Sequence, residues 1–276
     1  MTISNHQYYG LRARPAPDRI KKCRGYAGLR EATSPNKPSS DFKNEISVQM
    51  KYQMKSSFLA AEELLAMRDF ANATVQHTFS SLRIGESTQI ESWETPAQLS
   101  MVGEALVSNP ANILELGYGA GIASEDILRR NSYDSYVCIE VHPLIAAIAS
   151  NALSRDSSAV IINGAWQLVV PALRHQYFDA IINDAYLPFT DIAADRLYDP
   201  VDLSKYIMNS ARALHDIISP GGKLVQLDVT GRVNINEAEL IESGFSNVKY
   251  VPVSSSIPVS CKYAQGEFVN VVVLRK

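Results

Sequence analysis

Hydrophobic residues after Pro96 gather in seven short runs of strand length, which alternate with stretches of helical spacing. The runs span residues 112–116, 135–140, 159–162, 178–183, 223–228, 248–252 and 268–274. Helices are predicted over 95–108, 122–129, 143–153, 166–173, 203–218 and 235–243. This alternation predicts parallel βαβ units, so we expect an α/β fold with a doubly wound, mostly parallel seven-stranded sheet. Because the segment 253–267 is too short and too rich in Ser and Pro for a crossover helix, the last strand should be antiparallel.

The first part of the chain has a different character. Residues 1–55 are rich in Pro, Ser, Asn, Lys and Arg, which predicts an extended arm. From Ser56 to about Gly85 apolar residues fall near helical spacing, which predicts one or two helices. We therefore expect a basic N-terminal arm over 1–55, a helical lid or dimerisation segment over 56–93, and the main domain over 94–276.

Charge divides along nearly the same line. Residues 1–56 hold 11 of the 26 Lys+Arg and 4 of the 29 Asp+Glu, which leaves 15 basic and 25 acidic residues for the remainder. That remainder lacks the basic surface that supplies most nucleic-acid affinity, so no nucleic-acid partner is expected. The three cysteines are far apart and form no C-x-x-C pair, so no metal site is expected either. With no signal peptide and no apolar run of about 18 residues, we expect a cytoplasmic protein that does not enter a membrane.

The glycine-rich turn Glu115-Leu116-Gly117-Tyr118-Gly119-Ala120-Gly121 is the strongest local motif, because it joins an apolar run to a predicted helix. Glycines let the backbone turn sharply and approach a ligand, and the helix that follows offers its N–H groups. Glu140 ends the next run roughly 20 residues later, where a carboxylate can hold a ribose diol. A tight strand-to-helix turn that binds nothing is the alternative.

Nicotinamide and flavin folds need a small residue where Ile122 stands. The pattern instead resembles class I S-adenosylmethionine-dependent methyltransferases, which implies a Rossmann-like fold and S-adenosyl-L-methionine as cofactor. Trp166 follows the third strand, where such folds place adenine, and either packs against the base or is a core aromatic. The predicted cofactor-binding residues are Glu115, Gly117, Tyr118, Gly119, Gly121, Glu140, Val141, Gly164, Ala165, Trp166, Gln167 and Asp184.

Two further acids, Glu94 and Asp184, are candidates for the chemistry. Asp184 follows the fourth strand, at the carboxyl edge where open α/β sheets bind ligands. Glu94 begins the helix before the glycine-rich turn, and taken alone it is explained as a carboxylate in a first helical turn.

Several motifs together resemble guanidinoacetate methyltransferase and, less specifically, the arginine δ-N-methyltransferases. The most specific are Trp93-Glu94-Thr95-Pro96 and Asp184-Ala185-Tyr186. Leu82-Arg83-Ile84, Gly164-Ala165-Trp166, Phe178-Asp179, Ser219-Pro220-Gly221-Gly222 and Cys261-Lys262-Tyr263 add to them. The resemblance implies that Glu94 and Asp184 grip the guanidinium of a small-molecule acceptor, and we place Trp93 and Tyr186 in the same substrate site.

The chemistry is consistent with this pair. Two carboxylates can satisfy the planar fork of a guanidinium and orient one nitrogen. A guanidinium has a pKa above about 12 and no free lone pair, so a base must accept a proton as the N–C bond forms. We assign that role to Asp184, with Glu94 as the positioning and neutralising group and no metal.

The segment after the fifth strand departs from the family. Val229 and Thr230 align with backbone contacts that hold the guanidinoacetate carboxylate, but Asp228 adds a negative charge there. The hypothesis is that Asp228 receives an α-ammonium group, which favours arginine or an arginine-like compound over guanidinoacetate. The alternative is a strand-end acid that is solvated or contacts Arg232.

The sequence thus predicts a guanidino N-methyltransferase. The alternatives are a protein arginine or other small-amine N-methyltransferase, and a catalytically silent S-adenosylmethionine-binding partner subunit. Residues ahead of Trp93 fold over the active site in the relatives, so we expect a lid there. A dimerisation helix, and with it a homodimer, is the alternative for this segment.

Overall fold

The computed structural model describes residues 68–276, except 79, 86, 131–132, 186–199, 262–263 and 265. The predicted arm over 1–55, the first part of the predicted helical segment and Tyr186 lie outside the described residues. Within the described residues, no helix has the length and hydropathy needed to cross a membrane.

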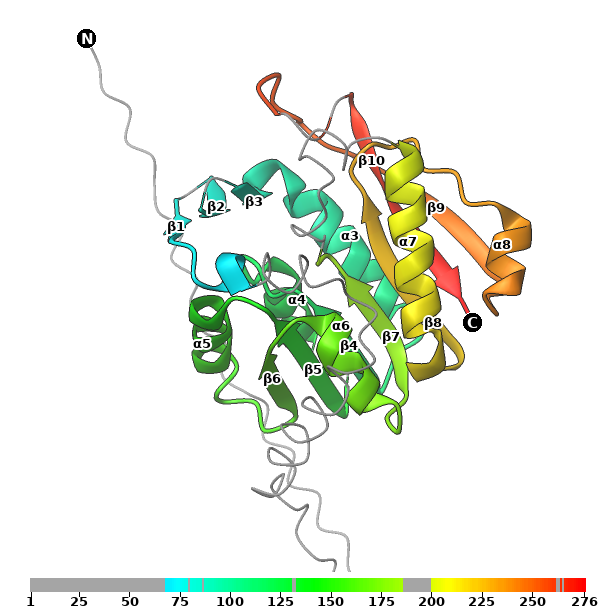
Figure 1. Cartoon of the computed structure of the whole chain (residues 1–276), viewed down its shortest axis with the longest axis horizontal. Helices are drawn as coiled ribbons and strands as arrows, with labels where there is room; N and C mark the ends of the chain where they lie inside the picture. Colours follow the sequence, from blue (N-terminus) through cyan, green and yellow to red (C-terminus); the bar gives the residue numbers. More distant parts are fainter. Residues whose placement is uncertain are drawn as a thin grey trace, which may run out of the picture. The chain divides into compact units, whose positions relative to one another are not determined.

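A seven-stranded sheet forms the centre of the main domain (Figure 1). Its strands are β4 (Asn112–Leu116), β5 (Ser135–Glu140), β6 (Ala159–Asn163), β7 (Phe178–Asn183), β8 (Ile218–Asp228), β9 (Asn247–Ser254) and β10 (Phe268–Arg275). Their order across the sheet is β6-β5-β4-β7-β8-β10-β9. Strands β4 to β8 pair in parallel, and β10 is antiparallel to both β8 and β9. The predicted doubly wound, mostly parallel sheet with an antiparallel last strand is confirmed.

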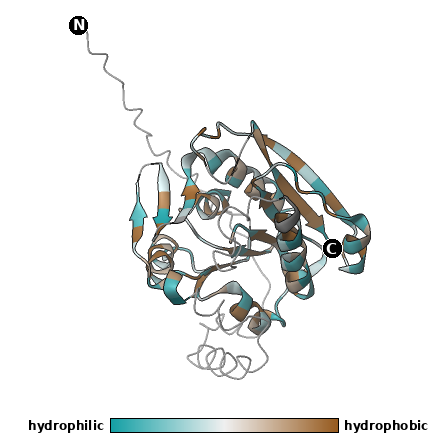
Figure 2. Cartoon of the chain, turned by 45° about the horizontal axis from the view of Figure 1, so that its top comes forward, coloured by the Kyte–Doolittle hydropathy of each residue, from teal (hydrophilic) through white to brown (hydrophobic). Residues whose placement is uncertain are grey.

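The burial pattern explains why these segments form this sheet. Residues 113–116 of β4 are buried on both faces, as expected for a strand covered by helices on each side. Strand β9 lies at the edge, and its exposed and partly buried residues mostly alternate, so its colours vary along its length in Figure 2. Strand β8 begins at Ile218, earlier than the predicted start at Lys223.

Helices cover both faces of the sheet. They are α3 (Thr95–Leu106), α4 (Ile122–Arg130), α5 (Pro143–Ala152), α6 (Trp166–Val169), α7 (Pro200–Leu214) and α8 (Glu237–Glu242), with short 3₁₀ turns η2 (Ser92–Glu94), η3 (Val170–Leu173) and η4 (His215–Ile217). Helix α3 packs on α4 and on β7, β8 and β10, and α7 packs on β8 from the opposite face (Figure 1). Met101, Val102 and Ala105 of α3 are fully buried in this contact. The packing fixes the start of α3 beside the carboxyl end of β7.

The segment ahead of Trp93 contains a small antiparallel sheet. Its strands β1 (Val75–His77), β2 (Ser81–Ile84) and β3 (Ser87–Glu91) pair in sequence order. The helical prediction is wrong for residues 72–85, because the described helical residues of this segment are 68–71. Buried Leu82 and Ile84 flank exposed Arg83, a strand alternation, and Gly85 turns the chain with φ of 58°.

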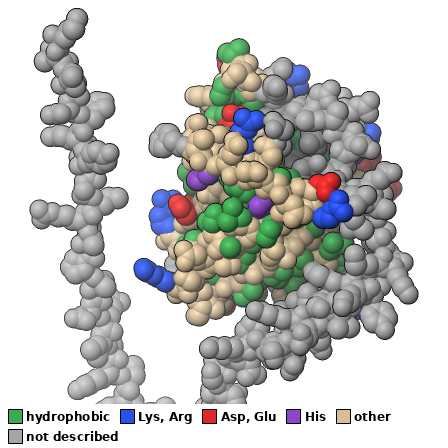
Figure 3. Space-filling model, turned by 60° about the vertical axis from the view of Figure 1, so that its left-hand side comes forward, with side chains coloured by type: hydrophobic (Ala, Val, Ile, Leu, Met, Phe, Trp, Pro, Cys, Tyr) green, Lys and Arg blue, Asp and Glu red, His purple; other side chains and the backbone are tan. Residues whose placement is uncertain are grey.

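One outer face carries exposed apolar side chains. Leu144 and Ile148 lie one turn apart on α5 and are about half exposed, and Val160 lies on the edge strand β6. Figure 3 views the molecule from the side of α5 and the N-terminal sheet, and hydrophobic side chains gather on that face. The homodimer stays a prediction.

Candidate active site

A cavity lies between the N-terminal sheet and the carboxyl ends of the parallel strands. The first side is lined by Phe70, Leu82, Ile84, Gln89 and Ile90. The second side is lined by Gly117, Gly119, Glu140, Val141, Ile145, Trp166, Gln167, Asp184 and Ala185. The fold therefore brings predicted residues from four strand ends to one cavity, and a sheet covers them where we predicted helices.

The glycine-rich turn lies directly against that cover. Gly117 and Gly119 both have positive φ, at 85° and 54°. A Cβ built on Gly119 would overlap Cδ1 of Ile90 in β3, so the end of that side chain would have to move, and the positive φ adds strain for any other residue. The backbone conformation thus favours glycine at this position, and the turn lies in contact with Ile90 of the N-terminal sheet.

Glu140 holds the glycine-rich turn in shape. Its Oε2 accepts the backbone N–H groups of Tyr118 at 2.9 Å and Gly119 at 3.4 Å, and its Oε1 accepts that of His142 at 2.7 Å. Burial raises the pKa of Glu140, while these three hydrogen bonds oppose the rise. The carboxylate lies on the cavity lining, next to Val141, where a ribose diol could replace some of these donors.

Glu115 lies beneath the turn and does not belong to the described lining. Its carboxylate accepts hydrogen bonds from the hydroxyl groups of Ser124, at 2.7 Å, and Tyr136. Burial raises the pKa of Glu115 to about 7, and those hydroxyl donors oppose the rise. Gly121 is also absent from the described lining, and the ring of Tyr118 packs against it. Glu115 thus ties the start of α4 to β5, and any effect on a cofactor would pass through the turn.

Two buried donors mark the other end of the cavity. Trp166 is 8% exposed, and neither its Nε1 nor the Nε2 of Gln167 has a hydrogen-bond partner in the described part of the chain. Gly164 donates its N–H to the Glu140 carbonyl at 2.9 Å, and Ala165 is the N-cap of α6. Buried donors without partners are costly, and the ring nitrogens of an adenine could accept from them. These residues therefore fit the adenosine of S-adenosyl-L-methionine.

Asp184 follows β7 on the side of the cavity nearest α3. Its backbone N–H donates to the Leu116 carbonyl at 3.2 Å, and its half-buried side chain lines the cavity. The Nε2 of Gln98 donates to Asp184 Oδ2. Burial raises the pKa of Asp184 to about 6, and the hydrogen bond from Gln98 opposes that rise.

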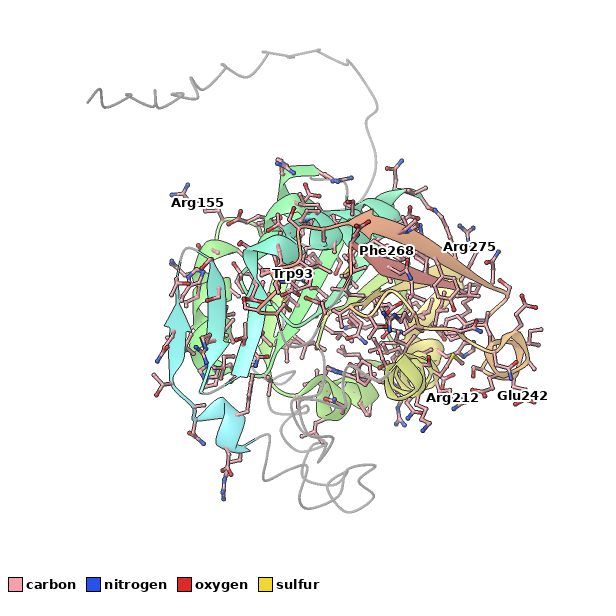
Figure 4. The ribbon with its side chains drawn as sticks, turned by 90° about the horizontal axis from the view of Figure 1, so that it is seen from above. Trp93, Arg155, Arg212, Glu242, Phe268 and Arg275 are labelled. Atoms are coloured by element: carbon pink, nitrogen blue, oxygen red, sulfur yellow. The ribbon has the colours of Figure 1, made fainter. Side chains whose placement is uncertain are left out.

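Glu94 and Trp93 lie at the start of α3. Glu94 is 4% exposed, and its Oε1 accepts the Glu91 N–H at 2.8 Å, while Trp93 Nε1 donates to Glu91 Oε2 at 3.0 Å. Figure 4 looks down on this edge and shows Trp93 near its centre, with Arg155, Arg212, Glu242 and Arg275 at the periphery. Glu94 is not among the described lining residues.

Gln98 connects this helix start to Asp184. It follows Glu94 by four positions, so both lie on one face of the helix start, and Gln98 is 3% exposed. Our sequence prediction missed Gln98, because its partner Asp184 lies 86 positions later and no local pattern connects the two. The structure therefore places Glu94 within one helical turn of a residue that contacts Asp184.

Asp228 is placed differently from the prediction. It is fully buried, and its Oδ1 accepts the N–H and hydroxyl of Thr230 at 3.0 and 2.6 Å. Its Oδ2 accepts the Val233 N–H at 3.0 Å and the Asn270 amide at 3.2 Å. Both oxygens are occupied, so the expectation that Asp228 receives an α-ammonium group is corrected, as is its alternative of a solvated acid. The backbone N–H of Thr230, which we predicted to contact the substrate, donates to Asp228 instead. Val229, the other predicted contact, is buried.

A known family and a known protein are similar in sequence to this chain. A sequence model described as guanidinoacetate N-methyltransferase matches residues 56–275. Protein arginine N-methyltransferase 2 of Saccharomyces cerevisiae is 31% identical over 118 residues, which are 40% of this chain and 28% of that protein. The chain therefore matches less than a third of the length of this curated relative.

Two solved structures resemble parts of the chain. Spermidine synthase from Thermotoga maritima has a TM-score of 0.48 and 16% identity, over 71% of this chain and 64% of that one. N-methyltransferase NodS from Bradyrhizobium japonicum WM9, in complex with S-adenosyl-L-homocysteine, has a TM-score of 0.46 and 16% identity, over 78% of this chain and 98% of that one.

The family match covers most of the chain and includes the start of α3, the glycine-rich turn and Asp184. The cofactor of this methyltransferase family is S-adenosyl-L-methionine, and the glycine-rich turn, Glu140 and the two buried donors fit it. The chain belongs to the guanidinoacetate N-methyltransferase family.

Proposed function

We propose that the protein transfers the methyl group of S-adenosyl-L-methionine to a guanidino nitrogen of a small molecule. The observation that carries this proposal is the position of the Asp184 carboxylate, on the cavity lining beside the glycine-rich turn. Its Oδ2 is held by Gln98, while its Oδ1 has no hydrogen-bond partner among the described residues. An acceptor N–H could therefore reach Oδ1.

The charges around the cavity favour a cationic acceptor. Glu140 and Asp184 are the charged side chains of its described lining, which contains no Lys or Arg. Glu94 adds a third carboxylate one helical turn from the Gln98–Asp184 contact. A guanidinium matches this arrangement because its planar fork can donate to two carboxylates at once.

The residues of this chain would then act as follows. When bound, the cofactor supplies an electrophilic methyl group on its sulfonium. Asp184 Oδ1 accepts the proton of the reacting nitrogen while the N–C bond forms and the bond from methyl to sulfur breaks. Glu94 neutralises the remaining charge and keeps the nitrogen in line. The N-terminal sheet keeps water away from the reacting groups, because Leu82, Ile84 and Ile90 line that side.

The structure removes the reason for ranking arginine above guanidinoacetate. That ranking rested on Asp228, whose oxygens are occupied by Thr230, Val233 and Asn270. Guanidinoacetate appears in the name of the family and arginine in that of the yeast relative, and both acceptors present a guanidinium. The proposal therefore covers small guanidino compounds, and both free arginine and guanidinoacetate are candidates among them.

The test is a panel of acceptors. Purified full-length protein is given S-adenosyl-L-methionine with arginine, agmatine, guanidinoacetate or an arginine-containing peptide, and release of S-adenosylhomocysteine is followed. We expect release with at least one small guanidine. Cofactor binding without release above background for any guanidine would contradict the proposal. A clear preference for the peptide would favour the protein arginine alternative.

A further inference from the structure

We infer that Gln98 is a positioning residue for the proposed reaction, because its amide holds one oxygen of Asp184 and leaves the other to meet the acceptor nitrogen. This inference rests on the proposed role of Asp184. Gln98 lies outside the family motifs that the sequence shows, so the inference assigns a function to a residue that those motifs do not include.

The geometry around Asp184 supports this assignment. Gln98 lies on the second turn of α3, is 3% exposed, and donates its Nε2 to Asp184 Oδ2. This is the one hydrogen bond that the Asp184 side chain makes within the described part of the chain. The backbone is fixed separately, since the Asp184 N–H donates to Leu116 and the Tyr206 hydroxyl donates to the Ala185 carbonyl. Rotation of the carboxylate is thus controlled by Gln98 alone among these contacts.

The groups that face Asp184 give Gln98 a second task. They are Glu115 from the adjacent strand β4 and Tyr206 from α7, and each interacts electrostatically with Asp184. Glu94 lies one turn earlier on α3. All three are acidic or phenolic, so the neutral amide donor of Gln98 is what opposes the effect of burial on Asp184.

Two substitutions of similar size separate these effects. Gln98→Met keeps the length of the side chain and removes the donor, whereas Gln98→Glu keeps the shape and adds a negative charge. We expect the acidic limb of kcat/KM to move up by about one pH unit in Gln98→Met and further in Gln98→Glu. At pH 7, kcat should fall by about tenfold in Gln98→Met, with KM for the acceptor changing less. Glu104→Gln is the control, because it removes a charge from the same helix where Glu104 contacts Lys249. The acidic limb of kcat/KM should not move in this variant.

A second measurement does not depend on activity. In protein labelled with ¹³C at aspartate carboxyl groups, the Asp184 resonance, identified by its loss in Asp184→Asn, should titrate at higher pH in Gln98→Met than in wild type. This separates the two proposals. If wild type methylates no guanidine, the proposed function fails, and the resonance still tests the contact. If wild type is active but neither variant moves the pH limb or the titration, the inference about Gln98 is overturned and the proposed function stands.

Discussion

Neighbouring strands β7 and β8 each lead into an aspartate, and the two aspartates have opposite surroundings. Asp184 is half-buried on the cavity lining and has one donor, Gln98, in the described part of the chain. Asp228 is fully buried and accepts four hydrogen bonds, three from Thr230 and Val233 and one from Asn270.

The contrast shows what makes a strand-end acid available for chemistry. Both acids lie at the edge where α/β sheets bind ligands, so position does not distinguish them. The number of hydrogen-bond donors around each carboxylate does distinguish them. A carboxylate with both oxygens occupied cannot accept a substrate proton without losing existing hydrogen bonds. Asp184 keeps an oxygen for a ligand, whereas Asp228 organises the loop after β8.

The largest expected effect is on catalysis. Asp184→Asn should lower turnover by on the order of 10³-fold, because it removes the proton acceptor, while cofactor affinity changes little. Single-turnover kinetics and calorimetric titration of the cofactor measure the two quantities. Asp228→Asn serves as the matched control and should retain turnover per folded molecule. Full activity in Asp184→Asn would contradict the proposal that Asp184, and not Asp228, accepts the proton.

The second effect is on stability. Asp228→Asn replaces one acceptor oxygen by an amide that cannot accept, so we expect a loss of about 2–4 kcal/mol in the free energy of unfolding. Urea denaturation measures it. If stability is unchanged while KM for arginine rises and KM for agmatine does not, Asp228 binds the acceptor and the contrast is wrong.

The third effect is on the pH dependence of the reaction. Burial raises the pKa of Asp184 to about 6, and only the ionised form can accept a proton. Activity should therefore fall about tenfold per pH unit below 6 and level off above it, in profiles of kcat/KM. Asp228→Asn should keep the same limb. A profile of kcat/KM that stays flat down to pH 5 would show that Asp184 does not accept the proton in the chemical step.

The smallest effect is on the pH dependence of stability. Because the pKa of Asp184 is raised in the native state, the stability linked to its protonated form is present at low pH and is lost as pH rises through about 6. Asn mimics the protonated form, so Asp184→Asn should melt a few degrees higher than wild type at pH 8. The difference should shrink towards pH 4, near the ordinary pKa of an aspartate. A constant difference across this range would show that the carboxylate is not protonated more readily in the native state.

Much of the fold could be predicted because parallel strands are buried on both faces and appear as continuous apolar runs. The early start of β8 was missed, since Ser219, Pro220, Gly221 and Gly222 suggest a turn. The strands β1 to β3 were missed because each has three to five residues, too few for a clear period of two.

The site was predictable where it depends on strand ends. Glu140 and Asp184 share the cavity because the carboxyl ends of parallel strands meet at one edge. The partners of these acids were not predictable. Gln98 and Asp184 are 86 positions apart, and Asn270 and Asp228 are 42 apart, so no local pattern connects them.

The central claim concerns the atom that receives the methyl group. The most direct test is to incubate the full-length protein with methyl-deuterated S-adenosyl-L-methionine and, in turn, with arginine and guanidinoacetate, and to locate the label by fragment mass spectrometry. We expect the label on the guanidino group in wild type, and labelling that is slower by on the order of 10³-fold in Asp184→Asn. Label on the α-amino nitrogen, or equal labelling of the guanidino group in both proteins, would contradict it.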